Sequence, residues 1–302
     1  MAGQALLPSN VKDPTGQDAR ERAAIRDFNA RLTRIRTLYV SALAGFPRQR
    51  ITVNADITQY NVTPELLAGV LDDVGAQVER ILMEGGPSDL WFTDAYVEPA
   101  YQQGTAQQVT NLSVQSAMYA ASRPNLTQLI SSTPYRTRLG FLKVRIADTL
   151  KGYATDVRTR MGQVLQDGLA VGRGARDIAK RLTEATGVSS RKAETIARTE
   201  VPGALRAGRL EEADQAGRDL GLMTREMHFS ALSPTTRPSH RARHAHLYTT
   251  QQQREWWAIV PNMINCKCST VTVLVNAKGE PLTPGVIDRA RALLEKNPAP
   301  SQ

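Results

Sequence analysis

The feature that most constrains the fold is a helical spacing of apolar residues that recurs, with short interruptions, from about residue 17 to residue 216. In residues 17–44, apolar side chains return every three or four positions, which places them on one face of a helix. Glycine and proline then separate this segment from the next ones. The same criteria predict further helices over residues 63–84, 88–121 with a bend at Pro99, 135–170, 175–186 and 189–216.

The pattern changes after Gly221. Residues 223–229 (MTREMHF) alternate in polarity, and residues 267–275 (KCSTVTVLV) are rich in β-branched side chains, so both segments are predicted strands. A short helix is expected at 284–296. The predicted fold class is therefore mainly α, with a long-helix N-terminal region followed by a small α+β C-terminal unit. The predicted domains are a helical partner-binding region (1–130), a central domain (131–280) and a C-terminal helix and tail (281–302).

Composition narrows the class of protein further. Hydrophobic residues make up 41% and charged residues 22%, which is typical of a globular chain. No apolar run approaches the roughly 18 residues of a membrane span, and the first residues do not resemble a signal peptide. We expect synthesis in a cytoplasm, where a disulfide between Cys266 and Cys268 is disfavoured.

The charge is distributed unevenly. The net charge is +9, but residues 64–122 carry 1 basic and 8 acidic side chains, whereas residues 123–210 carry 17 basic and 7 acidic ones. Either these segments neutralise each other by packing, or the basic one binds nucleic acid or an acidic protein. The candidate nucleic-acid-binding residues are Arg158, Arg160, Arg173 and Arg176.

One group of residues has the character of a metal site. Imidazoles and thiolates are the structural ligands that zinc prefers. A Cys-x-Cys pair can place two sulfurs on one ion, although the spacing here is not that of a standard zinc finger. The alternative is a hydrogen-bonded loop with two small buried thiols. The candidate ligands are His240, His244, His246, Cys266 and Cys268.

Signatures of common enzymes are missing from the sequence. It contains no Gly-Lys-Ser/Thr phosphate loop, no nucleophile elbow and no His-Glu-x-x-His motif. A zinc-dependent hydrolase would need a general base near the metal, and the nearby carboxylates in the sequence are Glu226 and Glu255, neither at a recognisable spacing. We therefore predict no catalytic residue. A host DNA-binding protein is a third alternative, but the chain lacks a helix-turn-helix signature.

Three short motifs resemble those of phage head-morphogenesis proteins of the Mu F-like type. They are Ala-Glu-Thr-Ile-Ala-Arg-Thr-Glu at 193–200, Thr-Arg-Pro-Ser-His at 236–240 and Asn-Cys-Lys-Cys at 265–268. They occur in the family's order and with its separations, and the resemblance covers about residues 135–275. Some relatives have further cysteines near the histidine, which this chain lacks. The residues that match the family pattern are Ala197, Arg198, Thr199, Glu200, Arg237 and Asn265.

The resemblance implies a minor head protein of a tailed bacteriophage, assembled in the host cytoplasm and held inside the capsid near the portal of the virion. It implies a role in head morphogenesis, with DNA packaging or ejection as a further expectation. Its partners would be the portal protein, other capsid or scaffold proteins and double-stranded DNA, bound without sequence specificity. The alternative is a zinc-dependent hydrolase, nuclease or modifying enzyme injected with phage DNA.

Overall fold

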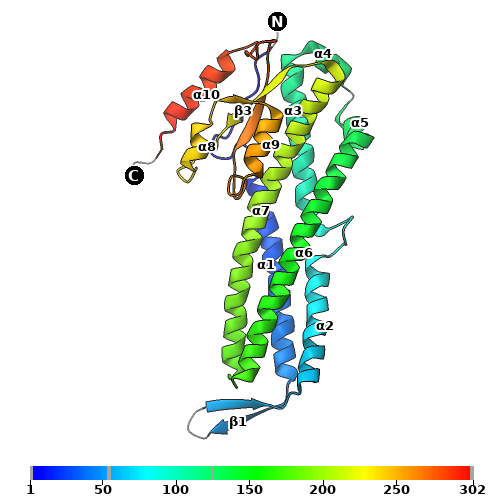
Figure 1. Ribbon diagram of the computed structural model, residues 1–302, viewed down its shortest axis with the longest axis vertical. Coiled ribbons are helices and arrows are strands. Elements are labelled where there is room, and N and C mark those ends of the chain that lie inside the picture. The colour runs from blue at the N-terminus through cyan, green and yellow to red at the C-terminus, as the bar shows by residue number, and fades with distance from the viewer. Residues whose placement is uncertain (1–2, 53–55, 124, 300–302) are drawn as a thin grey trace. The chain divides into compact units, whose positions relative to one another are not determined.

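A computed structural model describes residues 3–52, 56–123 and 125–299 of the chain. Helices dominate it and two small antiparallel sheets complete it, which confirms the predicted fold class. The elements are α1 (Asp18–Gly45), β1 (Arg48–Thr52), β2 (Asp56–Tyr60), α2 (Pro64–Leu82), the π-helix η1 (Thr93–Val97), α3 (Glu98–Gln115), α4 (Ala117–Ser122), α5 (Leu126–Ser131), α6 (Thr133–Ala170), α7 (Ala175–Leu220), β3 (Thr224–Phe229), α8 (Pro238–Ala242), β4 (Leu247–Tyr248), α9 (Thr250–Ala258), β5 (Ser269–Leu274) and α10 (Gly285–Lys296) (Figure 1).

The chain divides into two compact units that are not continuous in sequence. This division differs from the linear domains predicted above, because α1, α6 and α7 each contribute residues to both units. No described helix combines the length and apolar character that a membrane span requires. The first unit contains Met1–Glu21, Ala95–Leu142 and Arg198–Gln302, and the second contains Arg22–Asp94 and Lys143–Ala197.

Aromatic packing forms the centre of the second unit. The ring of Phe28 on α1 lies 4.8 Å from Trp91, 5.2 Å from Phe92 and 5.8 Å from Tyr153, measured between ring centroids. Such offset and edge-to-face pairs add stability beyond the area that they bury. Helix α2 begins where the sequence predicted, because the Thr63 side chain accepts a hydrogen bond from the Leu66 amide and a proline follows in the first turn.

The predicted break near Gly187 is wrong, since α7 runs through it without interruption. Ser189, expected to start a new helix, instead donates its hydroxyl to the carbonyl of Ala185 one turn earlier. A glycine inside a helix costs only about 1 kcal/mol relative to alanine, which tertiary packing can offset. The helix also continues through Pro202.

A three-stranded antiparallel sheet, in the order β4-β3-β5, organises the C-terminal part of the first unit. One face of this sheet is apolar: Met227 and Phe229 from β3 and Val271 and Val273 from β5 pack with α10. The other face carries buried polar side chains, among them Glu226 and His228 from β3 and Thr270 and Thr272 from β5. This strict alternation follows from the two-residue repeat of a strand.

Helix α3 covers the outer edge of β5 with amide side chains. Asn111 and Gln115 both donate to the carbonyl of Thr272, at 2.8 and 2.9 Å, and Gln115 accepts from the Leu274 amide. Paired backbone groups of this kind prevent an exposed strand edge from pairing with another chain. The same helix approaches α7 closely, because a Cβ on Gly208 would lie 2.3 Å from the carbonyl oxygen of Tyr101.

Candidate metal centre

Three of the five predicted metal ligands converge in the first unit. His240 lies on α8, while Cys266 and Cys268 lie in the turn just before β5. The His240 Nδ1 atom is 3.4 Å from the Cys266 sulfur and 3.5 Å from the Cys268 sulfur. All three side chains are buried, and their ligand atoms lie within 4.8 Å of one another. These distances would allow a single ion to contact all three.

The structure places the other two predicted ligands elsewhere. His244 accepts a hydrogen bond from the Ser230 amide at Nδ1 (3.1 Å) and pairs through Nε2 with the Ala290 carbonyl (2.9 Å). These partners assign the proton to Nε2 and leave no ring nitrogen for a metal. Burial lowers the pKa of His244, in keeping with this neutral role. His246 is exposed and lies outside the group.

A buried arginine fixes the Cys-x-Cys turn. Arg206 on α7 donates Nη1 to the carbonyl oxygens of Cys266 (2.8 Å) and Cys268 (3.2 Å). Its guanidinium carbon also lies 4.7 Å from the centre of the Trp257 ring, an arrangement typical of a cation–π contact. Arg206 is not among the residues predicted from the sequence, although its position beside the apolar Leu205 on a helix was a signal that could have identified it.

The three family motifs meet at this turn. The Thr199 hydroxyl accepts a hydrogen bond from the Asn265 amide at 3.1 Å. Asn265 adopts a φ of 53°, in the left-handed region that asparagine tolerates better than most residues. Arg237 donates to the carbonyls of Pro261 (2.6 Å) and Ile264 (2.9 Å) in the same loop. The motifs therefore share a structural task, which is to hold the loop that carries the cysteines.

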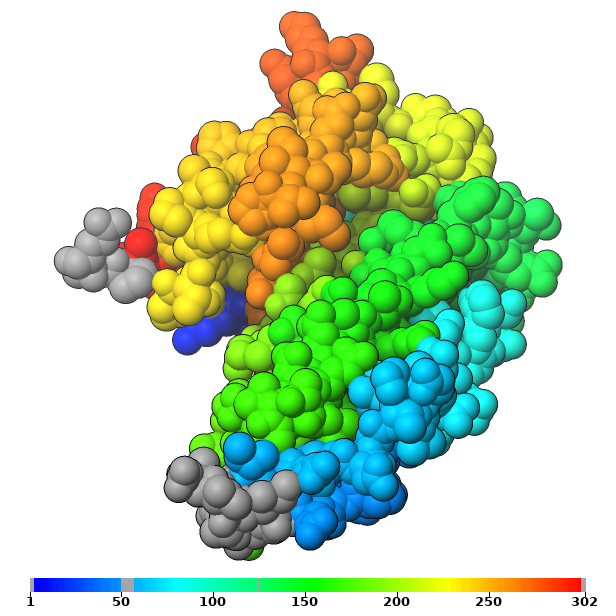
Figure 2. Space-filling view, turned by 60° about the horizontal axis from the view of Figure 1, so that its bottom comes forward, coloured from blue at the N-terminus to red at the C-terminus, as the bar shows by residue number. Residues whose placement is uncertain are grey.

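The remaining residues of the first motif lie beside Thr199 in the sequence of α7. Ala197 and Glu200 are buried, and Arg198 is exposed. In the space-filling view, the yellow and orange segments that run from about residue 230 to 270 form one continuous surface (Figure 2). The loop and the helix α8 are therefore neighbours at the surface as well as in the interior.

The pKa values of the two thiols are shifted in opposite directions. The hydrogen bond from Cys268 is the main cause that lowers the pKa of the Cys266 thiol, and His240 and Arg206 act in the same direction. Sharing its proton with Cys266, together with burial, raises the pKa of Cys268.

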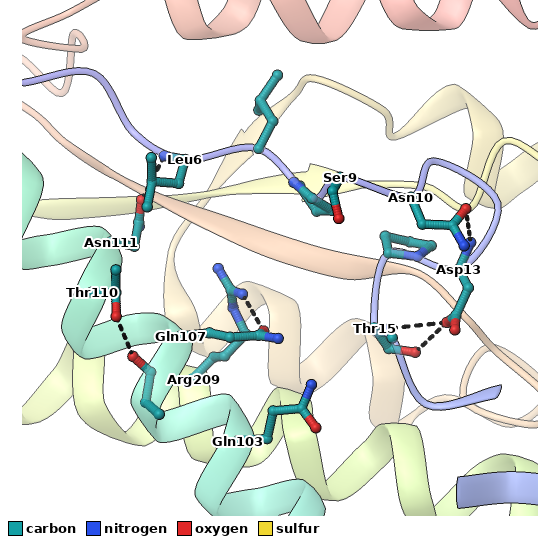
Figure 3. Close-up of a pocket in the computed structure, with 15 residues that line it drawn as sticks. Leu6, Ser9, Asn10, Asp13, Thr15, Gln103, Gln107, Thr110, Asn111 and Arg209 are labelled. Carbon is teal, nitrogen blue, oxygen red and sulfur yellow. Dashed lines mark hydrogen bonds between the residues drawn. The ribbon is translucent and has the colours of Figure 1, made fainter. Parts of the chain in front are cut away.

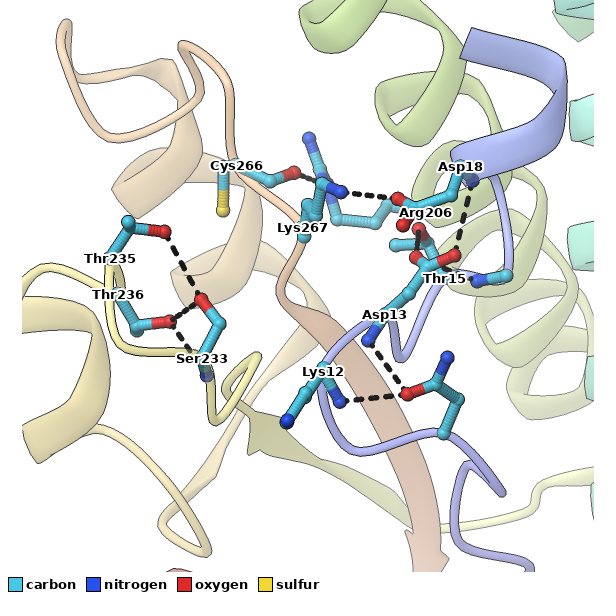
Figure 4. Close-up of polar contacts among 12 residues, drawn as sticks. Lys12, Asp13, Thr15, Asp18, Arg206, Ser233, Thr235, Thr236, Cys266 and Lys267 are labelled. Atoms are coloured by element: carbon cyan, nitrogen blue, oxygen red, sulfur yellow. Dashed lines mark hydrogen bonds and ion pairs between the residues drawn. The ribbon is translucent and has the colours of Figure 1, made fainter. Parts of the chain in front are cut away.

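A small hollow of about 90 Å³ opens beside the three side chains. It is lined by Ser233, Thr235, Thr236 and Lys267 as well as by His240 and the cysteines. Figure 4 shows Cys266 facing the loop that carries the three hydroxyl groups. No carboxylate belongs to this described lining.

Neither carboxylate considered as a general base lies in the hollow. Glu226 is buried in β3, where it accepts a hydrogen bond from the Thr272 hydroxyl at 2.6 Å. Glu255 is exposed on α9 and accepts from Gln251. The carboxylate of Asp18 lies near the site, because it forms an ion pair with Lys267. Burial raises the pKa of Glu21 to about 7, against the attraction of Lys267.

A larger hollow of about 550 Å³ lies between the N-terminal segment and α3 (Figure 3). The buried Arg209 lines it and donates to the side-chain oxygen of Gln107 at 2.9 Å. Burial lowers the pKa of Arg209 to about 10. On the far side, the carboxylate of Asp13 accepts from the Thr15 hydroxyl and the Gly16 amide at Oδ1 and from the Asp18 amide at Oδ2, so both oxygens are occupied.

The four arginines predicted to bind nucleic acid lie in the second unit. Two are paired with acidic side chains: Arg158 with Asp72 at 2.9 Å, and Arg173 with Asp177 at 3.2 Å. Arg160 and Arg176 are exposed. Two of the four arginines therefore already have an acidic partner that would compete with a phosphate group.

Comparison with known proteins agrees with the convergence of the motifs. Residues 159–271 match the model of a family described as Phage Mu protein F like protein. No curated protein and no solved structure matches the chain. The matched range contains α7, β3, β4, the loop with both cysteines and the first residues of β5. Over residues 159–271, the chain is thus similar to the Phage Mu protein F like family, in agreement with the motif resemblance.

Proposed function

We propose that this chain is a phage head-related protein that acts as a minor head component of a tailed bacteriophage, inside the capsid near the portal, in head morphogenesis. One observation carries the proposal. The family match extends over segments far apart in the sequence, and the structure joins its motifs through Thr199, Arg237 and Asn265 around one loop. The residues of the three motifs are therefore close together in the folded chain as well as in the family's order along the sequence.

The architecture supports an interaction role better than a catalytic one. Hydrolysis at a metal centre needs a group that activates water or protonates a leaving group. The described lining of the hollow at His240 offers hydroxyls and Lys267 but no carboxylate. We accordingly propose no catalytic residue, and we propose that this protein acts by binding partners.

Purified particles provide the direct test of the head assignment. We expect the full chain to be present in intact virions and in heads, and to co-purify with the portal protein when both are expressed together. Deletion of the gene should lower the yield of infectious particles. Absence of the chain from washed heads, together with failure to retain the portal protein, would refute the proposal.

Double-stranded DNA is the second partner that we propose, through the exposed arginines of the second unit. Phosphate contacts of this kind are independent of sequence and weaken as salt rises. Neutralising Arg160 and Arg176 should weaken binding and reduce the salt dependence by about 0.9 for each lost contact in the log–log slope. The matched control replaces two exposed arginines of α1 in the same unit, Arg22 and Arg34, with glutamine. Equal binding by the two double variants would contradict an interface at Arg160 and Arg176.

A further inference from the structure

We propose that His240, Cys266 and Cys268 bind one zinc ion through Nδ1 and two sulfurs, and that its fourth coordination position opens into the adjoining hollow. This inference is independent of the head assignment, because it rests on the three side chains and the space beside them. It concerns a metal site and implies no reaction.

The distances from His240 Nδ1 to the two sulfurs suit a tetrahedral ion. Zinc binds sulfur at about 2.3 Å and imidazole nitrogen at about 2.0–2.1 Å. With tetrahedral angles, these bond lengths place a nitrogen and a sulfur on the same ion roughly 3.6 Å apart. The observed separations from His240 Nδ1 are 3.4 Å to Cys266 and 3.5 Å to Cys268.

Hydrogen bonding alone explains this geometry poorly. An imidazole nitrogen carries either one hydrogen or one lone pair, so it can form one good hydrogen bond. Here one nitrogen, Nδ1 of His240, lies at nearly equal distance from two sulfurs. A cation placed among the three atoms satisfies the nitrogen and both sulfurs together.

The surrounding structure holds the donors in place before an ion binds. Arg206 fixes the carbonyl groups of both cysteines, so the two sulfurs are directed from one rigid turn. Trp256 packs against the His240 ring, with centroids 4.6 Å apart and planes at 69°. Such support limits the reorganisation that binding would require.

The fourth position distinguishes this centre from a closed structural zinc site. A closed site takes four protein ligands, whereas an open one takes three and a water. Among the described residues, no fourth histidine, cysteine or carboxylate joins the group. The hollow of about 90 Å³ has room for a few water molecules, at a liquid volume of about 30 Å³ each, and its Ser233, Thr235 and Thr236 hydroxyls could bind them.

Cobalt titration of the full-length protein tests the site without any assay of activity. The protein is purified in reducing buffer, stripped with a chelator and titrated with Co²⁺. We expect one equivalent to bind, with an intense sulfur-to-cobalt charge-transfer band and the visible bands of tetrahedral cobalt, and we expect zinc to displace it. Azide or imidazole should then shift the visible bands by entering the fourth position.

Variants assign the ligands. Cys266→Ser, Cys268→Ser and His240→Gln should each weaken Co²⁺ binding at least tenfold. His246→Gln is the matched control, because this histidine is close in sequence but exposed and outside the group. It should bind as the unmodified protein does.

Two results would overturn the inference. The first is an unmodified protein that is folded by circular dichroism, has both thiols reduced and yet binds no stoichiometric Co²⁺ or Zn²⁺. The second is binding that His246→Gln abolishes while His240→Gln leaves it intact. A stoichiometric site whose cobalt spectrum ignores azide and imidazole would overturn the open fourth position. The first result is measured on the unmodified protein. The test therefore remains decisive even if a variant fails to fold.

Discussion

The interiors of the two units differ in chemistry. In the second unit, the described buried polar side chains are Thr93 and Ser189, and the centre is filled with aromatic and aliphatic groups. The first unit buries ionisable side chains on the polar face of its sheet and around α8, among them Arg206, Glu226 and His240. Both units contain side chains that are fully buried, so the difference lies in which groups are buried.

The two kinds of interior differ in how strictly they specify the identity of each buried side chain. Apolar packing depends mainly on volume and tolerates exchange of similar side chains. A buried polar group, in contrast, costs free energy unless its partner is in place, so its position is specified by particular bonds. We infer that the second unit serves as a framework and that the first carries the site.

The largest expected effect concerns the apolar interior. Phe28→Ala should reduce the free energy of unfolding by about 3–5 kcal/mol, because it removes a fully buried ring and leaves a cavity among three aromatic neighbours. Chemical denaturation monitored by circular dichroism measures it. Phe141→Ala is the control, since Phe141 is 74% exposed and should change stability little. Similar losses for the two variants would show that the aromatic cluster is not the centre of stability.

These contrasts also explain which parts of the fold the sequence could predict. Helices α1, α2 and α6 and strands β3 and β5 have regular apolar spacing or alternation, and their predicted ranges agree with the structure within a few residues. The predicted helix break at Gly187 was wrong because tertiary contacts outweighed the local preference of glycine. Ser189 is buried in α7, and its carbonyl accepts the Tyr153 hydroxyl at 3.0 Å, so tertiary contacts keep this stretch helical.

At the candidate site, residue type predicted five ligands, and the structure brings three of them together. Residue type and spacing drew attention to His240 and the two cysteines. They could not separate His240 from His244, because the difference depends on Ser230 and Ala290, which meet the His244 ring only in the folded unit. Arg206 was missed for a similar reason, since its partners are backbone carbonyls distant in sequence.

The second prediction concerns acid stability of the polar interior. Burial lowers the pKa of His228 to about 3, against the opposing hydrogen bond with Gln253. The unfolded chain binds this proton near the ordinary histidine value of about 6.5, so stability is present above that pH and is lost as the pH falls. The loss from this group approaches about 1.4 kcal/mol per pH unit, or roughly 2 kcal/mol between pH 6.5 and 5.

Denaturant titrations across this pH range would measure the slope. His228→Gln should flatten it by the amount that one proton contributes. His246→Gln should leave the slope unchanged, because His246 is exposed. An identical pH dependence in unmodified protein and His228→Gln would show that this buried histidine does not couple folding to protons.

The third prediction concerns the loop that the family motifs hold. Arg237→Met should lower stability by about 1–1.5 kcal/mol, because it removes the guanidinium donor from the Pro261 and Ile264 carbonyls at a partly exposed site. Hydrogen exchange should rise in residues 259–268 while the helices of the second unit keep their protection. Arg291→Met on α10 is the control, with a side chain 62% exposed. Unchanged exchange in the loop would contradict a role for Arg237 in holding it.

The smallest expected effect comes from surface charge in the second unit. Arg158 and Asp72 form an ion pair at 2.9 Å, but their side chains are 46% and 77% exposed. Exposed pairs contribute between about 0 and 1 kcal/mol, because water and salt screen them and ordering two long side chains costs entropy. Asp72→Asn should therefore change the free energy of unfolding by less than about 1 kcal/mol, and by still less at high salt. This variant keeps Arg158, whose side chain packs beside Gly75. A loss above about 2 kcal/mol would exceed the range for an exposed pair. The framework unit would then depend on its surface charges as much as on its apolar interior, and the proposed contrast between the two units would fail.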